Sequence, residues 1–408
     1  MEQWKEYRLE EIGTVVGGAT PSTKDTTNYD GEIPWITPKD LSNHNDRYIY
    51  RGERMITQKG FESCSCKMLP KGSVLFSSRA PIGYVAIAGT DMCTNQGFKS
   101  VVPNNEIVDT HFLYYLLLFN KAKIEGMGSG TTFKEVSGNV MKSVTVSIPN
   151  LDEQKRIADF LSSLDDKIEL NRQINDNLEQ QAQALFKSWF VDFEPFKDGE
   201  FVDSELGMIP KGWEIVPLGD MVSVIDNRGK TPPLSECSTK FPIIDVKALS
   251  GTHRIINYSN CSKYVTEDIY NSFFRSGHPD KYDILLSTVG SLAELKIYMI
   301  NKGTIAQNVV ALRSKYPLYL YQYLFNKKGD LISYNIGSVQ PSIKVTHIVK
   351  YAILLPPKET IINFENILNS LTNQILKNEN ECQSLESIRD TLLPRLMSGE
   401  LKINEINC

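Results

Sequence analysis

The sequence lacks a long apolar run, an even set of cysteines and any periodic glycine or proline. No stretch of about 18 apolar residues occurs along the 408-residue chain, which excludes a membrane-spanning helix. The first residues, Met1 to Arg8, are charged and no apolar segment follows them, so we expect no signal peptide. The 26 glycines and 19 prolines are unperiodic, which excludes collagen-like and low-complexity chains. The seven cysteines are irregularly spaced, which favours reduced thiols in a cytoplasmic protein.

The sequence also lacks the motifs of common catalytic and cofactor sites. It contains no phosphate-binding Gly-x4-Gly-Lys-Ser/Thr segment and no His-Glu-x-x-His zinc motif. The glycine-rich segment 126–130 follows an expected helix rather than a strand, which is the wrong order for a dinucleotide-binding loop. Cys64 and Cys66 have no second cysteine pair and the five histidines are scattered, so we expect no zinc site. We therefore predict no catalytic, cofactor-binding or metal-binding residue in this chain.

One loose pattern resembles the site of a metal-dependent nuclease. Asp280, Glu294 and Lys296 are the residue types that hold Mg²⁺ and stabilise charge on a phosphate. This alternative predicts Mg²⁺-dependent cutting of DNA by the purified chain alone. The internal repeat described below argues against it, because Pro70 and Tyr84 stand where the other copy would need the two acids.

Charge is unevenly distributed along the chain, although the net charge is only −5. Residues 1–150 carry 16 basic and 16 acidic side chains, and residues 151–210 carry 6 and 14. Residues 211–355 carry 17 basic and 11 acidic side chains, and the last 53 residues carry 5 and 8. The basic block leaves a nucleic-acid partner possible in spite of the acidic total. The alternative is ordinary variation among solvated surface charges.

The chain contains an internal repeat with a period near 207 residues, whose offsets drift between 206 and 211. The matches keep the same order in both halves: Trp4 to Ile12 with Trp213 to Met221, Pro34 to Leu41 with Pro242 to Leu249, Gly72 to Ser78 with Tyr282 to Thr288, and Thr94 to Gly97 with Ile305 to Asn308. Small loop insertions would produce the drift. We conclude that the chain is two copies of one unit of about 205 residues, and that its 41% apolar residues suffice for two cores.

The second part of each unit carries an apolar stripe with alternating steps of four and three residues, which is typical of a coiled-coil seam. In the first copy the stripe comprises Ile157, Leu161, Leu164, Ile168, Asn171, Asn175, Leu178, Ala182 and Leu185. In the second copy it comprises Phe364, Leu368, Leu371, Ile375, Asn378, Cys382, Leu385, Arg389 and Leu392. Asn171 and Asn378 occupy the same seam position, and buried asparagines fix pairing register, so we expect the two helices to pair with each other.

Each helix is too long to be buried by one domain of this size. A helix over 151–190 would measure roughly 60 Å at 1.5 Å per residue, so we expect it to project from its domain. The alternative is a pair of ordinary amphipathic helices that each pack only on their own domain.

The first part of each unit mixes short strand-like runs with turns and one helix, which indicates an α+β globule of about 145 residues. The predicted fold is therefore two similar α+β globular domains separated by two long antiparallel coiled-coil helices, with an internal pseudo-two-fold repeat. The predicted boundaries are residues 1–150 for the first globular domain, 151–190 for the first helix, 191–210 for a linker, 211–355 for the second globular domain, 356–398 for the second helix and 399–408 for a tail.

The turn regions of both globules contain the residue types that contact phosphates and base edges, which favours binding of DNA over catalysis. The candidates in the first copy are Lys39, Ser77, Ser78, Arg79, Tyr84, Gln96, Lys99, Thr131, Thr132 and Lys134. Those in the second are Lys247, Ser287, Thr288, Gln307, Asn308, Gln340, Ser342 and Lys344. A surface residue without a ligand is the alternative for each of them, and only the set indicates an interface.

Four segments together resemble the specificity subunits of Type I restriction-modification systems, and the resemblance covers nearly the whole chain. The segments are Ile148 to Asn171, Leu185 to Pro195, Ile209 to Glu214 and Leu392 to Leu401. The second helix departs from the family pattern, because Pro356 to Ile361 has no Glu-Gln pair where one is expected. This departure concerns the subunit contacts of that helix and leaves its heptads intact.

The resemblance implies a non-catalytic subunit that binds double-stranded DNA. Such a subunit has two target-recognition domains that each read half of a split site, and antiparallel helices that hold these domains apart. It also implies two modification subunits that carry S-adenosylmethionine and methylate adenine N6, and restriction subunits that use ATP and Mg²⁺. The alternative is a bivalent scaffold built from the same repeat, without DNA specificity. If DNA is bound, the charge distribution predicts that the second domain contributes more of the salt-dependent affinity.

Overall fold

The structure, a computed structural model, describes residues 4–42, 44, 46–130, 134–251, 253–337 and 339–405. It divides into two compact units, Met1–Leu170 with Glu381–Cys408, and Asn171–Asn380. We call these the first unit and the second unit. Each unit contains one globular body and one half of each of the two long helices, α7 (Leu151–Phe190) and α12 (Lys358–Met397).

The first body is built on a five-stranded sheet in the order β2-β9-β6-β7-β4. Its elements are β1 (Lys5–Arg8), α1 (Leu9–Ile12), β2 (Gly13–Gly17), η1 (Thr26–Asn28), β3 (Tyr29–Ile36), α2 (Pro38–Ser42), β4 (Tyr48–Ile49), β5 (Met55–Ile56), α3 (Gln58–Glu62), β6 (Val74–Ser78), β7 (Ile82–Ala88), β8 (Cys93–Thr94), β9 (Lys99–Pro103), α4 (Thr110–Phe119), α5 (Lys121–Gly126), α6 (Gly138–Ser143) and β10 (Thr145–Ile148). Side chains of β6 alternate between two cores, because successive residues of a strand point to opposite faces. Val74 and Phe76 pack with α4 and α7, while Leu75 packs with Ile36 and Leu41 on the other face.

The second body repeats this arrangement on a sheet in the order β14-β19-β16-β17. Its elements are β13 (Glu214–Pro217), η3 (Leu218–Asp220), β14 (Val222–Asp226), β15 (Ile243–Ile244), η4 (Tyr258–Asn260), α8 (Glu267–Phe273), β16 (Ile284–Ser287), β17 (Leu295–Ile297), β18 (Thr304–Ile305), β19 (Val309–Ser314), α9 (Pro317–Asn326), α10 (Lys328–Ser333), α11 (Val345–Ile348) and β20 (Ala352–Leu355). Ile284 and Leu286 of β16 pack in one core and Leu285 in another, as their counterparts in β6 do.

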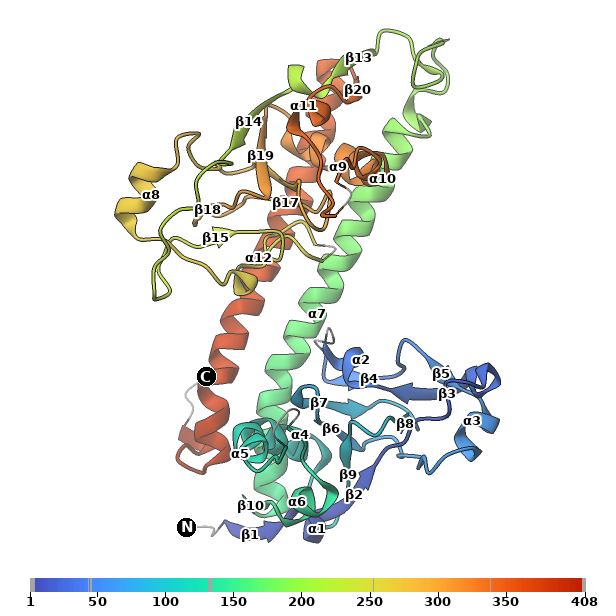
Figure 1. Cartoon of the computed structure of the whole chain (residues 1–408), viewed down its shortest axis with the longest axis vertical. Coiled ribbons are helices and arrows are strands. Elements are labelled where there is room, and N and C mark those ends of the chain that lie inside the picture. The colour runs from blue at the N-terminus through green and yellow to red at the C-terminus, as the bar shows by residue number, and fades with distance from the viewer. Residues whose placement is uncertain are drawn as a thin grey trace. The chain divides into compact units, whose positions relative to one another are not determined.

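The shared topology confirms the internal repeat and the predicted fold class. β1 pairs with β10 as β13 pairs with β20, and both pairs are antiparallel. β3 pairs with β8 as β15 pairs with β18, and both pairs are parallel. The parallel pair Tyr48 and Ile87 also has a counterpart in the bridge between Ile255 and Ile297. In Figure 1, β1 and β10 are labelled near each other in the first body, as β13 and β20 are in the second.

The long helices α7 and α12 have 40 residues each and begin at the same position of the repeat. Every residue of the predicted seam is buried or half-buried. The first turns of each stripe pack on the body of the same copy: Ile157 and Leu161 belong to the first body's core, and Phe364 and Leu368 to the second body's core. One apolar stripe therefore packs first on a globular body and further along on the other helix.

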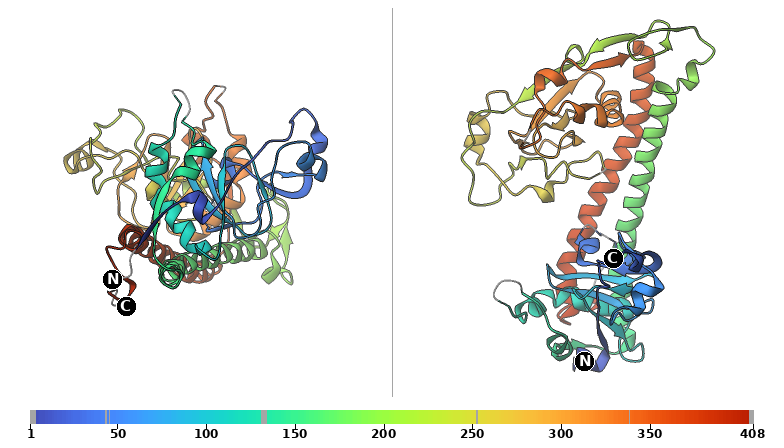
Figure 2. Two further views of the ribbon diagram at one scale, coloured as in Figure 1. Left: turned by 90° about the horizontal axis from the view of Figure 1, so that it is seen from below. Right: turned by 45° about the vertical axis from the view of Figure 1, so that its right-hand side comes forward.

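Within the first unit, the beginning of α7 runs antiparallel to the end of α12, as Figures 1 and 2 show. The Cys382 thiol donates to the Ile168 carbonyl at 3.7 Å. Further along, the Arg389 guanidinium binds the Asp165 carboxylate at 2.7 Å, and Asp165 also accepts the Tyr115 hydroxyl of α4 at 2.5 Å. These contacts place an ion pair inside the seam, next to the first body.

Within the second unit, the helices pair through two buried asparagines. The Asn378 amide donates to Asn175 Oδ1 at 2.9 Å, and the Asn175 amide donates to the Ile375 carbonyl at 3.4 Å. Asn378 therefore bonds to the seam position that follows Asn171 rather than to Asn171 itself. Asn171 is also buried, at 1% exposure.

The two helices start differently, as the departure at Pro356 to Ile361 suggests. Gln154 of α7 is buried, accepts the Asp109 N–H and donates to the Ile107 and Pro149 carbonyls, all at 2.8 to 3.0 Å. Ile361 occupies this repeat position in α12 and is fully buried in the second core. The glutamine is therefore an internal brace of the first body, and an apolar side chain replaces it in the second.

The described segments after each helix contain short elements that pack on the neighbouring body. Residues 191–210 contain η2 (Glu194–Phe196) and a hairpin of β11 (Phe201–Val202) and β12 (Ile209–Pro210). Their aromatic rings pack on Trp213. The tail contains η5 (Ile403–Glu405), and Leu401 and Ile403 pack on the first core. Among the described residues, no helix combines the length and apolar character needed to cross a lipid bilayer.

Candidate nucleic-acid interface

Each body carries a short hairpin that a buried serine closes from the inside. Ser77 Oγ donates to the Pro81 carbonyl at 2.8 Å and accepts the Tyr84 N–H at 2.8 Å. Ser287 Oγ donates to the Ser291 carbonyl at 2.6 Å and accepts the Glu294 N–H at 2.8 Å. The repeated hydroxyls found in the sequence therefore hold the same turn in both copies.

This finding corrects four of the predicted DNA-contacting residues. Ser77, Ser78, Ser287 and Thr288 are all 0% exposed, because they lie inside the strand pairs rather than on their tips. The Thr288 hydroxyl donates to the Asn308 carbonyl at 3.4 Å, whereas the buried Ser78 hydroxyl has no hydrogen-bond partner among the described residues. These hydroxyls shape the hairpins and are not available to a duplex in this structure.

Three segments meet beside the hairpin of the first body, and we call them the first edge: residues 78–82, 95–99 and 134–136. The Ser78 N–H donates to the Gly97 carbonyl at 2.7 Å, and the Val136 N–H donates to the Ser78 carbonyl at 2.9 Å. The first edge thereby brings together the predicted residues Arg79, Gln96, Lys99 and Lys134, of which Gln96 and Lys134 are exposed and the others half-buried. The predicted residue Tyr84 lies outside these segments, in β7, and packs against the core that contains Leu75. Thr131 and Thr132 lie outside the described residues.

The corresponding segments of the second body form the second edge: residues 288–292, 306–309 and 340–344. The Thr288 N–H donates to the Asn308 carbonyl, and the Ile343 N–H donates to the Thr288 carbonyl, both at 2.8 Å. The second edge brings together the predicted residues Gln307, Asn308, Gln340, Ser342 and Lys344, of which Gln340 and Lys344 are exposed and the others half-buried. Gln307 donates its amide to the Gly229 carbonyl at 3.2 Å.

Carboxylates pair with three of the cations around the first edge, whereas the exposed Lys134 makes no ion pair with a described residue. Glu135 lies between Arg79 and Lys99, at 3.4 Å and 3.6 Å from their nitrogens. Lys39 of α2 bonds to Glu53 at 2.6 Å, and this carboxylate raises the pKa of the Lys39 ammonium. Because the single carboxylate of Glu135 serves both Arg79 and Lys99, carboxylates offset part of the positive charge that the first edge offers to a polyanion.

Two exposed lysines around the second edge are not paired with carboxylates in this way. Lys247 and Lys344 are exposed, and neither makes an ion pair with a residue that the structure describes. Position 342 is a serine where the first copy has Glu135, and position 289 is a valine where it has Arg79. The second edge therefore offers uncompensated positive charge.

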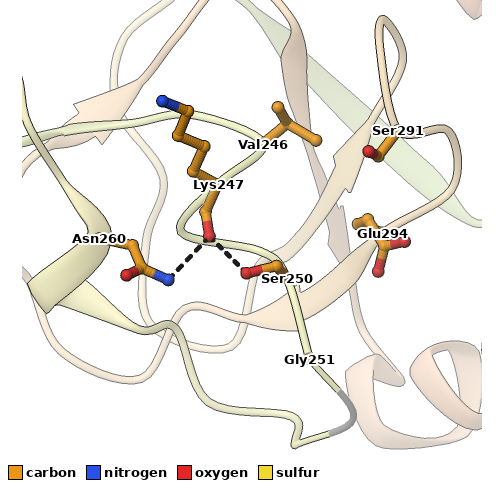
Figure 3. A pocket seen from close by; sticks show the side chains of 7 residues that line it. All are labelled: Val246, Lys247, Ser250, Gly251, Asn260, Ser291 and Glu294. Atoms are coloured by element: carbon orange, nitrogen blue, oxygen red, sulfur yellow. Dashed lines mark hydrogen bonds between the residues drawn. The ribbon is translucent and has the colours of Figure 1, made fainter. Parts of the chain in front are cut away.

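A polar cavity of about 390 Å³ lies next to the second hairpin, between residues 246–251 and the hairpin itself (Figure 3). The Lys247 carbonyl accepts the Ser250 hydroxyl at 2.7 Å and the Asn260 amide at 3.2 Å, which fixes one wall. Ser291 and Glu294 of the hairpin form the other wall, and Glu294 is paired with Lys328 at 2.9 Å. Lys247 therefore lies across the cavity from Ser291 of the hairpin, on a loop whose backbone carbonyl is bound by the Ser250 and Asn260 side chains.

The three residues of the nuclease alternative are each engaged with a different partner. Asp280 pairs with Arg313 at 2.8 Å, and Glu294 pairs with Lys328. The buried Lys296 ammonium donates to the Gly251 and His253 carbonyls, and burial lowers its pKa to about 8. Within the described part of the chain, no three His, Cys, Asp or Glu side chains are grouped as a metal site.

Two arginines that the sequence analysis did not single out connect the bodies to α7. Arg47 and Arg254 are both buried and both bind a glutamate of α7, Glu169 and Glu179. They are 207 residues apart, which is the offset that relates the two long helices. An arginine at the same repeat position in both copies was the sequence signal for these residues.

Comparison with known proteins gives the family. Residues 1–180 and 210–387 match the family described as Type I restriction modification DNA specificity domain. The MjaIX Type I restriction enzyme specificity subunit of Methanocaldococcus jannaschii is 37% identical over 417 residues, which cover 99% of this chain and 95% of that protein. The HindI specificity subunit of Haemophilus influenzae is 28% identical over 474 residues, covering 98% and 100%.

A solved structure shares the fold. The Type I restriction-modification system S subunit from M. genitalium superimposes with a TM-score of 0.58 at 17% identity, over 97% of this chain and 96% of that one. The family model matches both copies of the duplicated body. The chain therefore belongs to the Type I restriction-modification DNA specificity family.

Proposed function

We propose that this chain reads a bipartite DNA site for a Type I restriction-modification complex, with one half-site bound by each body and the gap set by α7 and α12. The observation that carries this proposal is the duplication: one topology occurs twice, each copy attached to halves of the same two helices, in a chain of the specificity family. Two rigid readers on a shared pair of helices suit two separated half-sites, as dimer geometry sets half-site spacing in symmetric DNA-binding proteins.

The two edges are the proposed contact surfaces. Exposed cations such as Lys134, Lys247 and Lys344 would bind phosphates and position the duplex. Exposed amides such as Gln96 and Gln340 would donate and accept at base edges, where sequence is read. The buried Ser77 and Ser287 would keep the hairpin backbones fixed while these side chains make contact.

The proposed partners supply the chemistry. Two modification subunits would bring S-adenosylmethionine and methylate adenine N6, and restriction subunits would bring ATP and Mg²⁺ for translocation and cleavage. This chain would contribute no catalytic group and no cofactor site. We place the complex in the cytoplasm, where its DNA substrate is.

Methylation sequencing of the host genome, with and without this gene, tests the proposal. We expect an asymmetric bipartite motif methylated on adenine in both half-sites in the parent, and unmethylated in the deletion strain. Complementation with the wild-type gene should restore the motif. A deletion strain that loses no bipartite motif would contradict the proposal and favour the scaffold alternative.

A further inference from the structure

In each unit, one arginine joins the central sheet of the body to a long helix. The Arg47 carbonyl accepts the Ile87 N–H at 2.7 Å, and the Arg254 carbonyl accepts the Ile297 N–H at the same distance. On the other side, the backbone N–H of each arginine donates to a glutamate of α7, at 2.9 Å in both units. We call Arg47 and Arg254 the sheet–helix arginines.

The sheet–helix arginine of the second unit is fully satisfied. Arg254 is 0% exposed, and its Nε and Nη2 donate to the two oxygens of Glu179 at 2.9 and 2.8 Å. Its Nη1 donates to the Thr372 hydroxyl of α12 at 2.6 Å. A buried charge is tolerated when its hydrogen bonds are complete, and a two-pronged arginine contact also fixes direction. Arg254 thus ties one body to both helices with fixed geometry.

The sheet–helix arginine of the first unit has a looser set of partners. Arg47 Nε is 3.5 Å from Glu169, and its Nη2 pairs with Asp166, whose side chain is 64% exposed. Arg47 Nη1 is buried, and no described residue gives it a hydrogen-bond partner. Through these contacts Arg47 ties its body to α7, whereas Arg254 ties its body to both α7 and α12.

We propose that Arg47 and Arg254 are positioning residues that set the angle of each body on its helices, and thereby the gap that the complex accepts between half-sites. The proposal rests on the proposed function, because the angle matters only if each body presents its edge to DNA. An edge displaced by about 3.4 Å along the duplex meets the neighbouring base pair, so a small change of angle changes the accepted gap.

The test uses the full chain assembled with its cognate modification subunits. The complex is given a pool of duplexes with the native half-sites and gaps one base pair shorter, native or one base pair longer, and the methylated products are sequenced. Arg254→Lys keeps the charge and the backbone bonds but loses the fork that reaches Glu179 and Thr372 together. Arg313→Lys is the matched control, because Arg313 binds the buried Asp283 at 2.8 Å entirely within the second body.

We expect Arg254→Lys to lower the preference for the native gap by about tenfold, the effect of losing one hydrogen bond to a charged group, with half-site base preferences unchanged. Arg47→Lys should lower it less, and Arg313→Lys should leave it unchanged. If Arg254→Lys does not fold, as judged by thermal melting, Glu179→Gln carries the same expectation.

Two results would overturn the proposal while leaving the proposed function intact: an unchanged gap preference in Arg254→Lys, or an equal loss of methylation at all three gaps, which a merely structural role produces. A wild-type complex that methylates no bipartite site would instead refute the proposed function, and the positioning proposal with it.

Discussion

The charge around the two edges predicts unequal salt dependence of DNA binding by the two bodies. Lys247 and Lys344 are exposed and make no ion pair with a described residue, whereas Lys39 pairs with Glu53, and Arg79 and Lys99 share Glu135. Removing an uncompensated lysine that contacts a phosphate removes one released counterion, whereas removing a paired lysine removes much less. The perturbation is therefore Lys247→Ala with Lys344→Ala, compared with Lys39→Ala.

The expected change in the salt dependence of binding follows from the release of about one counterion for each phosphate contact. Each phosphate contact contributes about 0.9 to the slope of log K against log salt, so the double variant should lose up to about 1.8. When salt rises from roughly 50 to 200 mM, each phosphate contact accounts for about a 3.5-fold fall in affinity, and this part of the fall is lost with the contact. Lys39→Ala should change the slope by less than either single variant of the second body.

The assay measures binding of the assembled complex to a fluorescent duplex that carries its site, over a series of salt concentrations. Thermal melting of each variant checks that folding is unaffected. Equal slope changes for the variants of the two bodies would refute the reasoning, and so would a double variant with the wild-type slope.

Two further predictions concern the helices. Glu365 accepts the Tyr319 N–H at 2.7 Å, and burial raises the pKa of its carboxyl from 4.5 to about 7. Between these two values the folded state holds a proton that the unfolded state releases. The contribution of Glu365 to stability is therefore full below pH 4.5 and is lost as the pH rises to about 7. Glu365→Gln should match the wild type in thermal midpoint near pH 5 and exceed it near pH 8; an identical pH dependence in both proteins would contradict this. Asn378→Leu leaves Asn175 Oδ1 buried without its donor and should lower the free energy of unfolding by about 1–3 kcal/mol, whereas adding Asn175→Leu should recover most of the loss. Urea unfolding measures both variants, and a fully stable single variant would show that the asparagine bond contributes nothing.

The repeat and the helical stripe could be predicted because burial imposes them on the sequence. The steps of four and three residues from Ile157 onward follow from the need to cover one face of a helix. The stagger between the helices could not be predicted, because it depends on where each body docks. The bond from Asn378 therefore reaches Asn175, although Asn171 holds the equivalent position in its own helix.

The candidate site was predicted only in part, because residue type does not say which side of a strand faces solvent. Ser77 and Ser287 recur for a reason, but that reason is an internal bond that closes a hairpin. The apolar run Val74 to Phe76 directly before Ser77 was the sequence feature that indicated a buried strand at this position. The 207-residue offset relates Arg47 to Arg254, but their burial and partners could not be assigned from sequence, since an arginine is usually exposed and their glutamates lie 122 and 75 residues away.

The internal serine bonds of the two hairpins affect how the sequence of such a protein can evolve. Because Ser77 and Ser287 hold the backbone through their own hydroxyls, the outward neighbours Arg79 and Val289 differ while the turn stays the same. A scaffold whose shape does not depend on its outer side chains can accept new ones singly, without compensating changes in its interior. New target preferences can then arise by substitution at a few surface positions, and two copies in one chain can diverge independently.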